Sequence, residues 1–203
     1  MSEACRSSLL WGPKGGVNPR FLGWNRVGAS RMFLIISETG DAMSVEQAPF
    51  WVGHEDGEAY WVLGGLYTYK ALADQVGGDY TAIEVRAEVG MAIPVHYHDK
   101  ETEAFYVADG AVTLLVGDDE VMAGPGSFIF VPPKIEHAFR FESNGTMLLL
   151  FTRGSAHEGL FREIGEAAPR REVPPPPDEF PDPEQMAEVA ARFGTRIVGP
   201  PLA

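Results

Sequence analysis

The feature that most constrains the fold is a series of short segments, separated by turn residues, between residues 60 and 153. In Thr81–Val89, for example, apolar and charged side chains alternate, which is typical of a strand with one buried face. Turns such as Gly117-Asp118-Asp119 and Gly124-Pro125-Gly126 occur at close spacing. Many short strands in this rhythm predict an all-β fold, either a sandwich or a barrel.

The other expected strands show the same alternation or a run of β-branched and aromatic residues. They are Tyr60–Tyr69 (broken at Gly64 and Gly65), Glu103–Ala108, Ala111–Val116, Glu120–Ala123, Ser127–Val131, His137–Glu142 and Met147–Thr152. Because Met147–Thr152 is apolar on both faces, we expect it to be a fully buried strand.

The hydrophobic period becomes helical in the C-terminal part. Ala156–Ile164 predicts a helix that ends before Gly165, and Pro174–Pro177 predicts a polyproline linker. Asp182 is a candidate N-cap with Pro183 at the first helical position. The apolar stripe of this second helix consists of Met186, Val189, Ala190 and Phe193. We expect the stripe to dock against the sheet.

Composition argues against two classes of partner and excludes one class of metal site. A formal net charge of −13 and a pI near 4.7 argue against binding to nucleic acid or to an anionic membrane. Cys5 is the single cysteine, which excludes an intrachain disulfide and a thiolate metal site. The apolar run at Met32–Ile36 is too short for a signal peptide or a membrane span. We therefore expect a soluble cytoplasmic protein.

Residues 1–42 differ in charge from the acidic remainder of the chain, with five Lys and Arg against three Asp and Glu. Either this segment is a flexible extension or the natural start is Met43. We expect residues 1–45 to form a poorly ordered N-terminal extension.

Three of the five histidines and one carboxylate form the candidate metal site. Because side chains alternate along a strand, His96 and His98 point to the same face about 7 Å apart. Glu103 follows shortly, and His137 comes later in the chain. Imidazole and carboxylate groups are common ligands of transition metals. Glu101 shares strand parity with Glu103 and is the alternative carboxylate.

The spacing of these residues resembles the two motifs of the cupin superfamily, over about residues 60–153. The first motif agrees at every defining position: Gly90, five residues, His96-x-His98, four residues, Glu103, six residues and Gly110. The second motif is Gly126, five residues, Pro132, four residues and His137. This chain has Lys134 where the family usually has glycine, which leaves the turn geometry open. It has Phe141 where asparagine is usual, which makes the cavity more apolar.

The resemblance implies a cupin jelly-roll β-barrel, or double-stranded β-helix, over residues 46–153 with its motif-bearing core at 60–153. Residues 154–203 would then be a helical segment that packs on the barrel. The implied ligands of one divalent transition metal ion (Fe, Ni, Co, Mn, Cu or Zn) are His96, His98, Glu103 and His137. Such a set leaves one or two positions open for catalysis. The six-residue step to Gly110 favours Glu103 over Glu101.

Flanking segments resemble bacterial single-domain cupins of the quercetin 2,3-dioxygenase-like group. These segments are Tyr60-Trp61, Gly159–Glu163 and Arg196–Pro201. The resemblance implies that a flavonol or a similar enolisable aromatic is opened oxidatively by O2, with loss of carbon monoxide. Glu103 would be both a metal ligand and the catalytic base, and a homodimer is expected.

A pocket for such a small-molecule substrate should be apolar and aromatic. The candidate wall residues are Phe105, Phe128, Phe130, Phe139 and Phe141, although phenylalanine is also common in jelly-roll cores. Trp61, Tyr67 and Tyr69 either cover the barrel mouth or belong to a dimer interface. His54 and His157 lie outside both motifs and are expected at the surface or in loops.

Two other functions stay open. One is a non-redox cyclase or isomerase for a polyketide-like or other small molecule, in which a Lewis acid polarises a carbonyl. The other is a non-catalytic metal-binding cupin. Oxygen uptake with a redox-active metal supports the dioxygenase. Zinc without oxygen uptake supports the cyclase or isomerase, and ligand binding without product supports the non-catalytic cupin.

Overall fold

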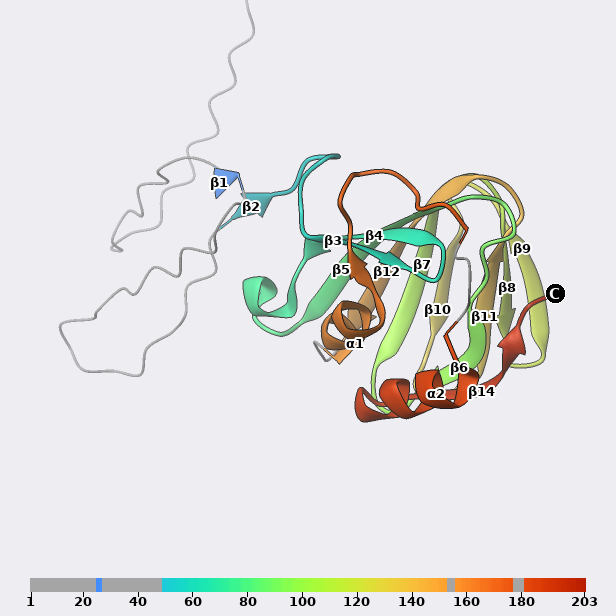
Figure 1. Ribbon diagram of the computed structural model, residues 1–203. Coiled ribbons are helices and arrows are strands. Elements are labelled where there is room, and N and C mark those ends of the chain that lie inside the picture. The colour runs from blue at the N-terminus through green and yellow to red at the C-terminus, as the bar shows by residue number, and fades with distance from the viewer. Residues whose placement is uncertain (1–24, 27–48, 153–155, 177–180) are drawn as a thin grey trace, which may run out of the picture.

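The computed structural model describes residues 25–26, 49–152, 156–176 and 181–203 (Figure 1). Apart from Asn25 and Arg26, the extension predicted over residues 1–45 lies outside the described residues. The strands are β1 (Asn25–Arg26), β2 (Phe50–Trp51), β3 (Ala59–Val62), β4 (Gly65–Ala71), β5 (Tyr80–Ala87), β6 (Pro94–His98), β7 (Thr102–Asp109), β8 (Val112–Val116), β9 (Asp119–Ala123), β10 (Phe128–Val131), β11 (His137–Phe141), β12 (Gly145–Thr152), β13 (Glu166–Ala167) and β14 (Thr195–Pro201). The helices are α1 (Ala156–Ile164), α2 (Pro183–Arg192) and the short 3₁₀ helix η1 (Ala73–Val76).

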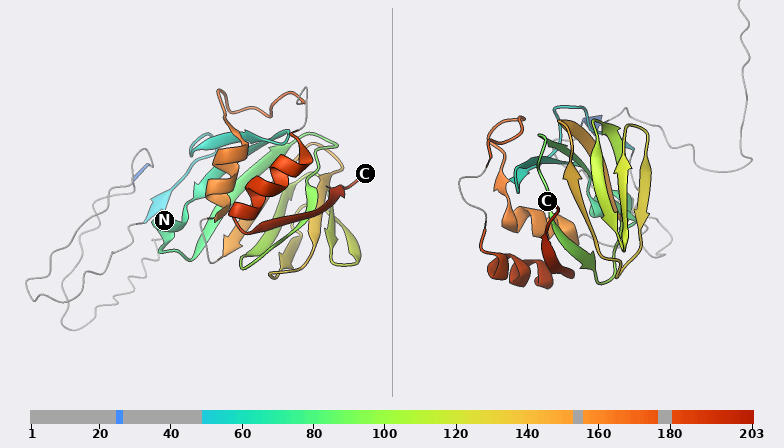
Figure 2. Two further views of the ribbon diagram at one scale, coloured as in Figure 1. Left: turned by 60° about the horizontal axis from the view of Figure 1, so that its bottom comes forward. Right: turned by 90° about the vertical axis from the view of Figure 1, so that its right-hand side faces the viewer.

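Two antiparallel sheets make up the body of the protein (Figures 1 and 2). One has the strand order β10-β7-β12-β5-β4-β3-β13, and the other has the order β14-β6-β11-β8-β9. Strands far apart in sequence therefore lie side by side, as in the pairing of β6 with β11. This arrangement confirms the predicted jelly roll. No helix in the described parts of the chain is long and apolar enough to cross a membrane.

The hydrophobic core lies between the sheets and takes side chains from both of them. Strand β5 shows how the alternation works, because Ile83 and Val85 are fully buried whereas Glu84 and Arg86 on the opposite face are partly exposed. The largest buried side chains of the core include Tyr67, Phe105, Phe139, Phe141 and Phe151. Burying such a side chain contributes about 1.5–3 kcal/mol relative to leaving it in water.

The prediction that Met147–Thr152 is buried on both faces is wrong. Burial alternates along β12, with Met147 and Leu149 in the core and Leu148 and Leu150 only partly covered. Leu148 and Leu150 instead pack on the outer face of the sheet against a small separate cluster that includes Val76. The apolar outer face therefore reflects this second cluster and not complete burial.

Both predicted C-terminal helices are confirmed, and they lie side by side (Figure 2). Helix α1 ends at Ile164, just before Gly165. Helix α2 begins at Pro183, and the Asp182 carboxylate accepts hydrogen bonds from two backbone N–H groups of its first turn. The chain then returns to the second sheet as β14, which pairs with β6. This last strand had no clear alternation in the sequence.

The turn in the second motif keeps a conformation that favours glycine, although it carries a lysine. Lys134 has φ +70°, in the left-handed region. Its backbone N–H donates to the carbonyl of His98 at 2.9 Å, and its ammonium group pairs with Asp99. The turn is therefore anchored to β6 through both backbone and side chain. The turn conformation, which the sequence left open, is therefore the left-handed one that glycine favours.

Candidate metal centre

Three neighbouring strand segments bring the four candidate ligands to one place. His96 and His98 lie on β6, and β6 pairs with β11 so that His137 stands opposite His96. Glu103 comes from β7 in the other sheet. The site therefore spans the interior between the sheets, and its geometry depends on their packing and not on one segment alone.

The structure brings all four predicted side chains together around one carboxylate oxygen. Glu103 Oε2 lies 2.8 Å from His98 Nε2, 2.9 Å from His137 Nε2 and 3.9 Å from His96 Nε2. The four residues are buried, and the atoms that they offer lie within 4.8 Å of one another. Such a cluster is compact enough to surround a single ion.

The hydrogen bonds of two imidazoles determine which nitrogen faces the cluster. His96 Nδ1 lies 2.9 Å from the carbonyl oxygen of Pro94, and His137 Nδ1 lies 2.8 Å from that of Ile135. A carbonyl can only accept a hydrogen bond, so Nδ1 carries the proton in both rings. In a neutral ring the Nε2 lone pair, on the side of Glu103, would then be available to a metal ion. Metal-bound histidines in proteins are oriented in the same way by such outer contacts.

The charges of the cluster fit a divalent cation. Burial lowers the pKa of His96 and His98, and the neighbouring imidazoles lower that of His96 further, so both rings favour the neutral form. Burial alone would raise the pKa of Glu103, but its contacts with His137 and His98 outweigh this effect and hold the pKa well below its ordinary value. Two imidazole nitrogens therefore lie within hydrogen-bond distance of one carboxylate oxygen. A divalent cation could take the place of the protons shared in these contacts, and the donor set suits a transition metal.

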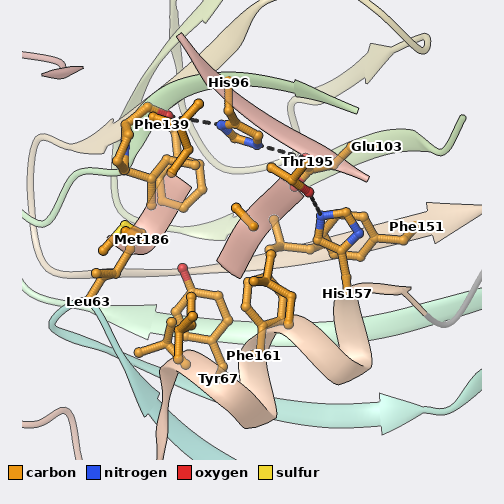
Figure 3. Close-up of a pocket in the computed structure, with 18 residues that line it drawn as sticks. Leu63, Tyr67, His96, Glu103, Phe139, Phe151, His157, Phe161, Met186 and Thr195 are labelled. Atoms are coloured by element: carbon orange, nitrogen blue, oxygen red, sulfur yellow. Dashed lines mark hydrogen bonds and ion pairs between the residues drawn. The ribbon is translucent and has the colours of Figure 1, made fainter. Parts of the chain in front are cut away.

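A largely apolar cavity of about 60 Å³ adjoins the cluster (Figure 3). His96 and Glu103 reach its wall, and side chains of α1, α2 and β14 close it from outside. The Tyr67 hydroxyl points into the cavity in Figure 3 and makes no hydrogen bond within the described part of the chain. Burial, together with the charge of Glu103, raises the pKa of Tyr67, so this hydroxyl keeps its proton.

A second apolar hollow of about 650 Å³ adjoins this cavity on the side of α2 and β14. The two share four wall residues, namely Leu63, Pro94, Met186 and Ile197. These side chains therefore separate a small inner space beside the candidate ligands from a larger outer groove.

The predicted aromatic wall is only partly realised. Phe139 lines the cavity, whereas Phe105 and Phe141 are fully buried in the core and do not line it. Phe128 and Phe130 are 60% and 57% exposed on β10. Because they share strand parity, both point away from the interior, and the structure places neither on the cavity wall.

The expectation that His157 is a surface or loop residue is wrong, whereas His54 is exposed as expected. His157 lies on α1, is 2% exposed and lines the cavity, and its Nδ1 lies 2.5 Å from Glu101 Oε2. The sequence did contain a signal for this, because His157 precedes Leu160, Phe161 and Ile164 at helical spacing on the buried face. Glu101, the alternative carboxylate, thus pairs with His157, and its carboxylate lies within 4.8 Å of a ring nitrogen of His98.

Comparison with known proteins relates the chain to one family. Residues 83–153 match the family model of the cupin domain. Over 114 residues the chain is 32% identical to quercetin 2,3-dioxygenase of Bacillus subtilis (strain 168), a match that covers 55% of this chain and 34% of that protein. The chain therefore spans about a third of the length of this curated relative.

Solved structures with a similar chain path include an RmlC-like cupin from Shewanella frigidimarina NCIMB 400 and KdgF from Halomonas sp.. Each has a TM-score of 0.47 and covers 53% of this chain and 94% of its own, at 19% and 20% sequence identity respectively. Oxalate decarboxylase from Bacillus subtilis has a TM-score of 0.45 at 20% identity and covers 49% of this chain and 28% of its own.

We predict that His98→Ala severely lowers the metal content of the purified protein, because it removes one of four ligands. Elemental analysis measures this, with His54→Ala as the matched control, since His54 is an exposed histidine remote from the cluster. Full metal occupancy in His98→Ala would contradict the ligand assignment.

Proposed function

We propose, from the match of residues 83–153 to the cupin family model and the similarity to a quercetin 2,3-dioxygenase, that the chain is a metal-dependent dioxygenase acting on a flavonol or a similar enolisable aromatic. The observation that carries this proposal is the convergence of three imidazole nitrogens on Glu103 beside an apolar cavity. The similarity to quercetin 2,3-dioxygenase supports the same reaction class.

The four clustered residues, His96, His98, Glu103 and His137, would hold the metal ion. When bound, a divalent transition metal supplies Lewis acidity for a substrate oxygen and, if it is redox-active, electron transfer with dioxygen. The overall reaction consumes one O2, opens the heterocycle of the flavonol and releases one carbon monoxide. The protein's own contribution is to bind the substrate, exclude water and accept a proton.

Glu103 is the proposed base. Its carboxylate is ionised at neutral pH, as its low pKa requires, and it reaches the cavity wall beside His96. An enolic hydroxyl that enters the cavity would approach this carboxylate, which can accept its proton. The apolar walls keep bulk water away from the anion that forms.

Tyr67 is the proposed group that orients the substrate. Its hydroxyl is protonated, unpaired and directed into the cavity, so it can donate a hydrogen bond to a carbonyl or phenolic oxygen. The inner cavity of about 60 Å³ takes only the reacting end of a multi-ring molecule, because pockets for such ligands are about 300–1,000 Å³. The outer groove of about 650 Å³ then gives room for the remaining rings, once Leu63 and Met186 at the shared wall turn aside.

The small inner cavity also favours a second candidate, a non-redox metal-dependent isomerase or cyclase for a smaller molecule. In that reaction Glu103 and Tyr67 would act as proton acceptor and donor around a polarised carbonyl. The two candidates differ in whether oxygen is consumed.

Oxygen uptake by the metal-loaded protein tests the proposed function directly. We expect a flavonol from a panel of flavonols and polyketide-like phenols to consume O2 and release carbon monoxide in a one-to-one ratio. Elemental analysis of the same preparation identifies the metal. Conversion of a panel compound with no oxygen uptake would instead support the isomerase or cyclase.

We predict that Glu103→Gln retains some metal but lowers turnover about 100-fold or more, because the amide cannot accept the substrate's proton. Turnover per bound metal separates this effect from loss of the ion. Glu136→Gln is the control, since Glu136 is exposed one residue before the strand that carries His137. Unchanged turnover per metal in Glu103→Gln would rule out the base role.

We predict that Tyr67→Phe weakens flavonol binding about three- to tenfold, which corresponds to one hydrogen bond. Quenching of tryptophan fluorescence in the absence of oxygen measures the affinity. Tyr69→Phe is the matched control, because the Tyr69 hydroxyl donates to the carbonyl of Glu158 at 3.0 Å and not into the cavity. Equal flavonol affinities in Tyr67→Phe and the unmodified protein would show that the hydroxyl does not contact the substrate.

A further inference from the structure

We infer that Thr195, His157 and Glu101 form a buried hydrogen-bond chain whose role is to position His98 for the metal. The need for such a chain follows from the three candidate histidine ligands. His96 and His137 are each fixed by a backbone carbonyl two residues earlier on their own segment. His98 instead has its Nδ1 3.2 Å from Thr195 Oγ1, a side chain on β14.

The hydrogen bonds run in one consistent direction when they are followed from the carboxylate of Glu101. An ionised carboxylate can only accept, so in the proposed chain a neutral His157 donates from Nδ1 to Glu101 Oε2, 2.5 Å away. His157 Nε2 is then the acceptor for the Thr195 hydroxyl at 3.2 Å, a contact drawn as a dashed line in Figure 3. The hydroxyl oxygen in turn accepts from His98 Nδ1. With a metal ion bound, this direction would leave the Nε2 lone pair of His98 for the metal, at the atom that lies 2.8 Å from Glu103 Oε2 in this structure.

Packing holds the chain in this arrangement. Thr195, His157 and Glu101 are 4%, 2% and 6% exposed, so water does not compete strongly for their hydrogen bonds. The His157 ring stacks on Phe151 with centroids 4.0 Å apart and an interplanar angle of 9°, and it meets the His98 ring edge-on at 4.4 Å. Strand pairing also sets Thr195 directly opposite His98.

The second oxygen of Glu101 supports a role beyond packing. Glu101 Oε1 is buried and has no hydrogen-bond partner in the part of the chain that the structure describes. An unsatisfied buried acceptor is costly, and a position that served packing alone would favour an apolar side chain. The carboxylate is explained by what its other oxygen does, which is to fix the tautomer of His157.

Two of the three residues lie outside the segment that matches the cupin family model, because His157 is on α1 and Thr195 is on β14. The C-terminal segment therefore supports a ligand that the motif provides. Residues that orient a metal-bound histidine typically change metal affinity 10- to 100-fold when they are removed. This inference rests on the metal site of the proposed function.

The test is Zn²⁺ affinity of the full chain, measured by competition with a chromophoric chelator. We expect Thr195→Val, which removes the hydroxyl but keeps the shape, to bind Zn²⁺ about tenfold more weakly. Thr195→Ser should restore most of the affinity. Thr113→Val is the matched control, because Thr113 is also a buried strand threonine bonded to a carboxylate, Glu142, at 2.6 Å. Equal Zn²⁺ affinity in Thr195→Val and the unmodified protein would overturn the inference.

A double-mutant cycle keeps the inference testable even if one variant lowers the stability of the fold. His157→Phe preserves an aromatic ring on Phe151 but breaks the chain. If both residues act through His98, the double variant Thr195→Val/His157→Phe should have the same Zn²⁺ affinity as whichever single variant has the lower affinity. Additive losses would mean two independent packing effects and would contradict a shared chain.

The spectrum of bound Co²⁺ adds a readout that a packing role would not move. We expect the ligand-field bands to shift in Thr195→Val and to stay unchanged in Thr113→Val. Failure of the unmodified protein to bind any divalent transition metal would overturn the proposed function itself. Normal binding by the unmodified protein with no change in the Thr195 and His157 variants would overturn only the positioning role.

Discussion

The rest of the site depends on one interaction, the convergence of imidazole nitrogens on the buried carboxylate of Glu103. His98 and His137 approach Glu103 Oε2 at 2.8 and 2.9 Å in a region that burial keeps dry. Burial disfavours imidazolium, as the lowered pKa values of His96 and His98 show, so neutral imidazoles lie beside an ionised carboxylate. Such an arrangement is favourable when a cation occupies the centre. Jelly-roll pairing of β6 with β11, across from β7, makes this convergence possible.

The C-terminal segment contributes both to the cavity wall and to the surroundings of His98. Helices α1 and α2 close the cavity beside the ligands, and β14 adds a strand next to β6. The same elements supply His157 and Thr195, which connect His98 to Glu101. One segment therefore lines the cavity and contacts one candidate ligand, His98. A change in α1 is expected to affect both substrate access and metal affinity.

Much of the fold and the ligand set could be predicted from the sequence because both follow local periods. Alternation marked β5, caps marked α1 and α2, and motif spacing brought out His96 and Glu103. Predictions failed where strand pairing, and not the hydrophobic period of the sequence, decides the structure. The outward direction of Phe130 depends on the register of β10 on β7, and β14 becomes a strand only by pairing with β6. His157 looked isolated because its partners lie far away in sequence.

We expect three imidazoles and one carboxylate to hold a single divalent metal ion. X-ray absorption at the edge of the bound metal measures the ligand set most directly. We expect nitrogen and oxygen atoms bound at about 2.0–2.2 Å for a metal such as zinc. We also expect multiple scattering from three imidazole rings, falling to two in His98→Ala. Bound oxygen alone, or fewer than three imidazoles in the unmodified protein, would contradict this ligand set.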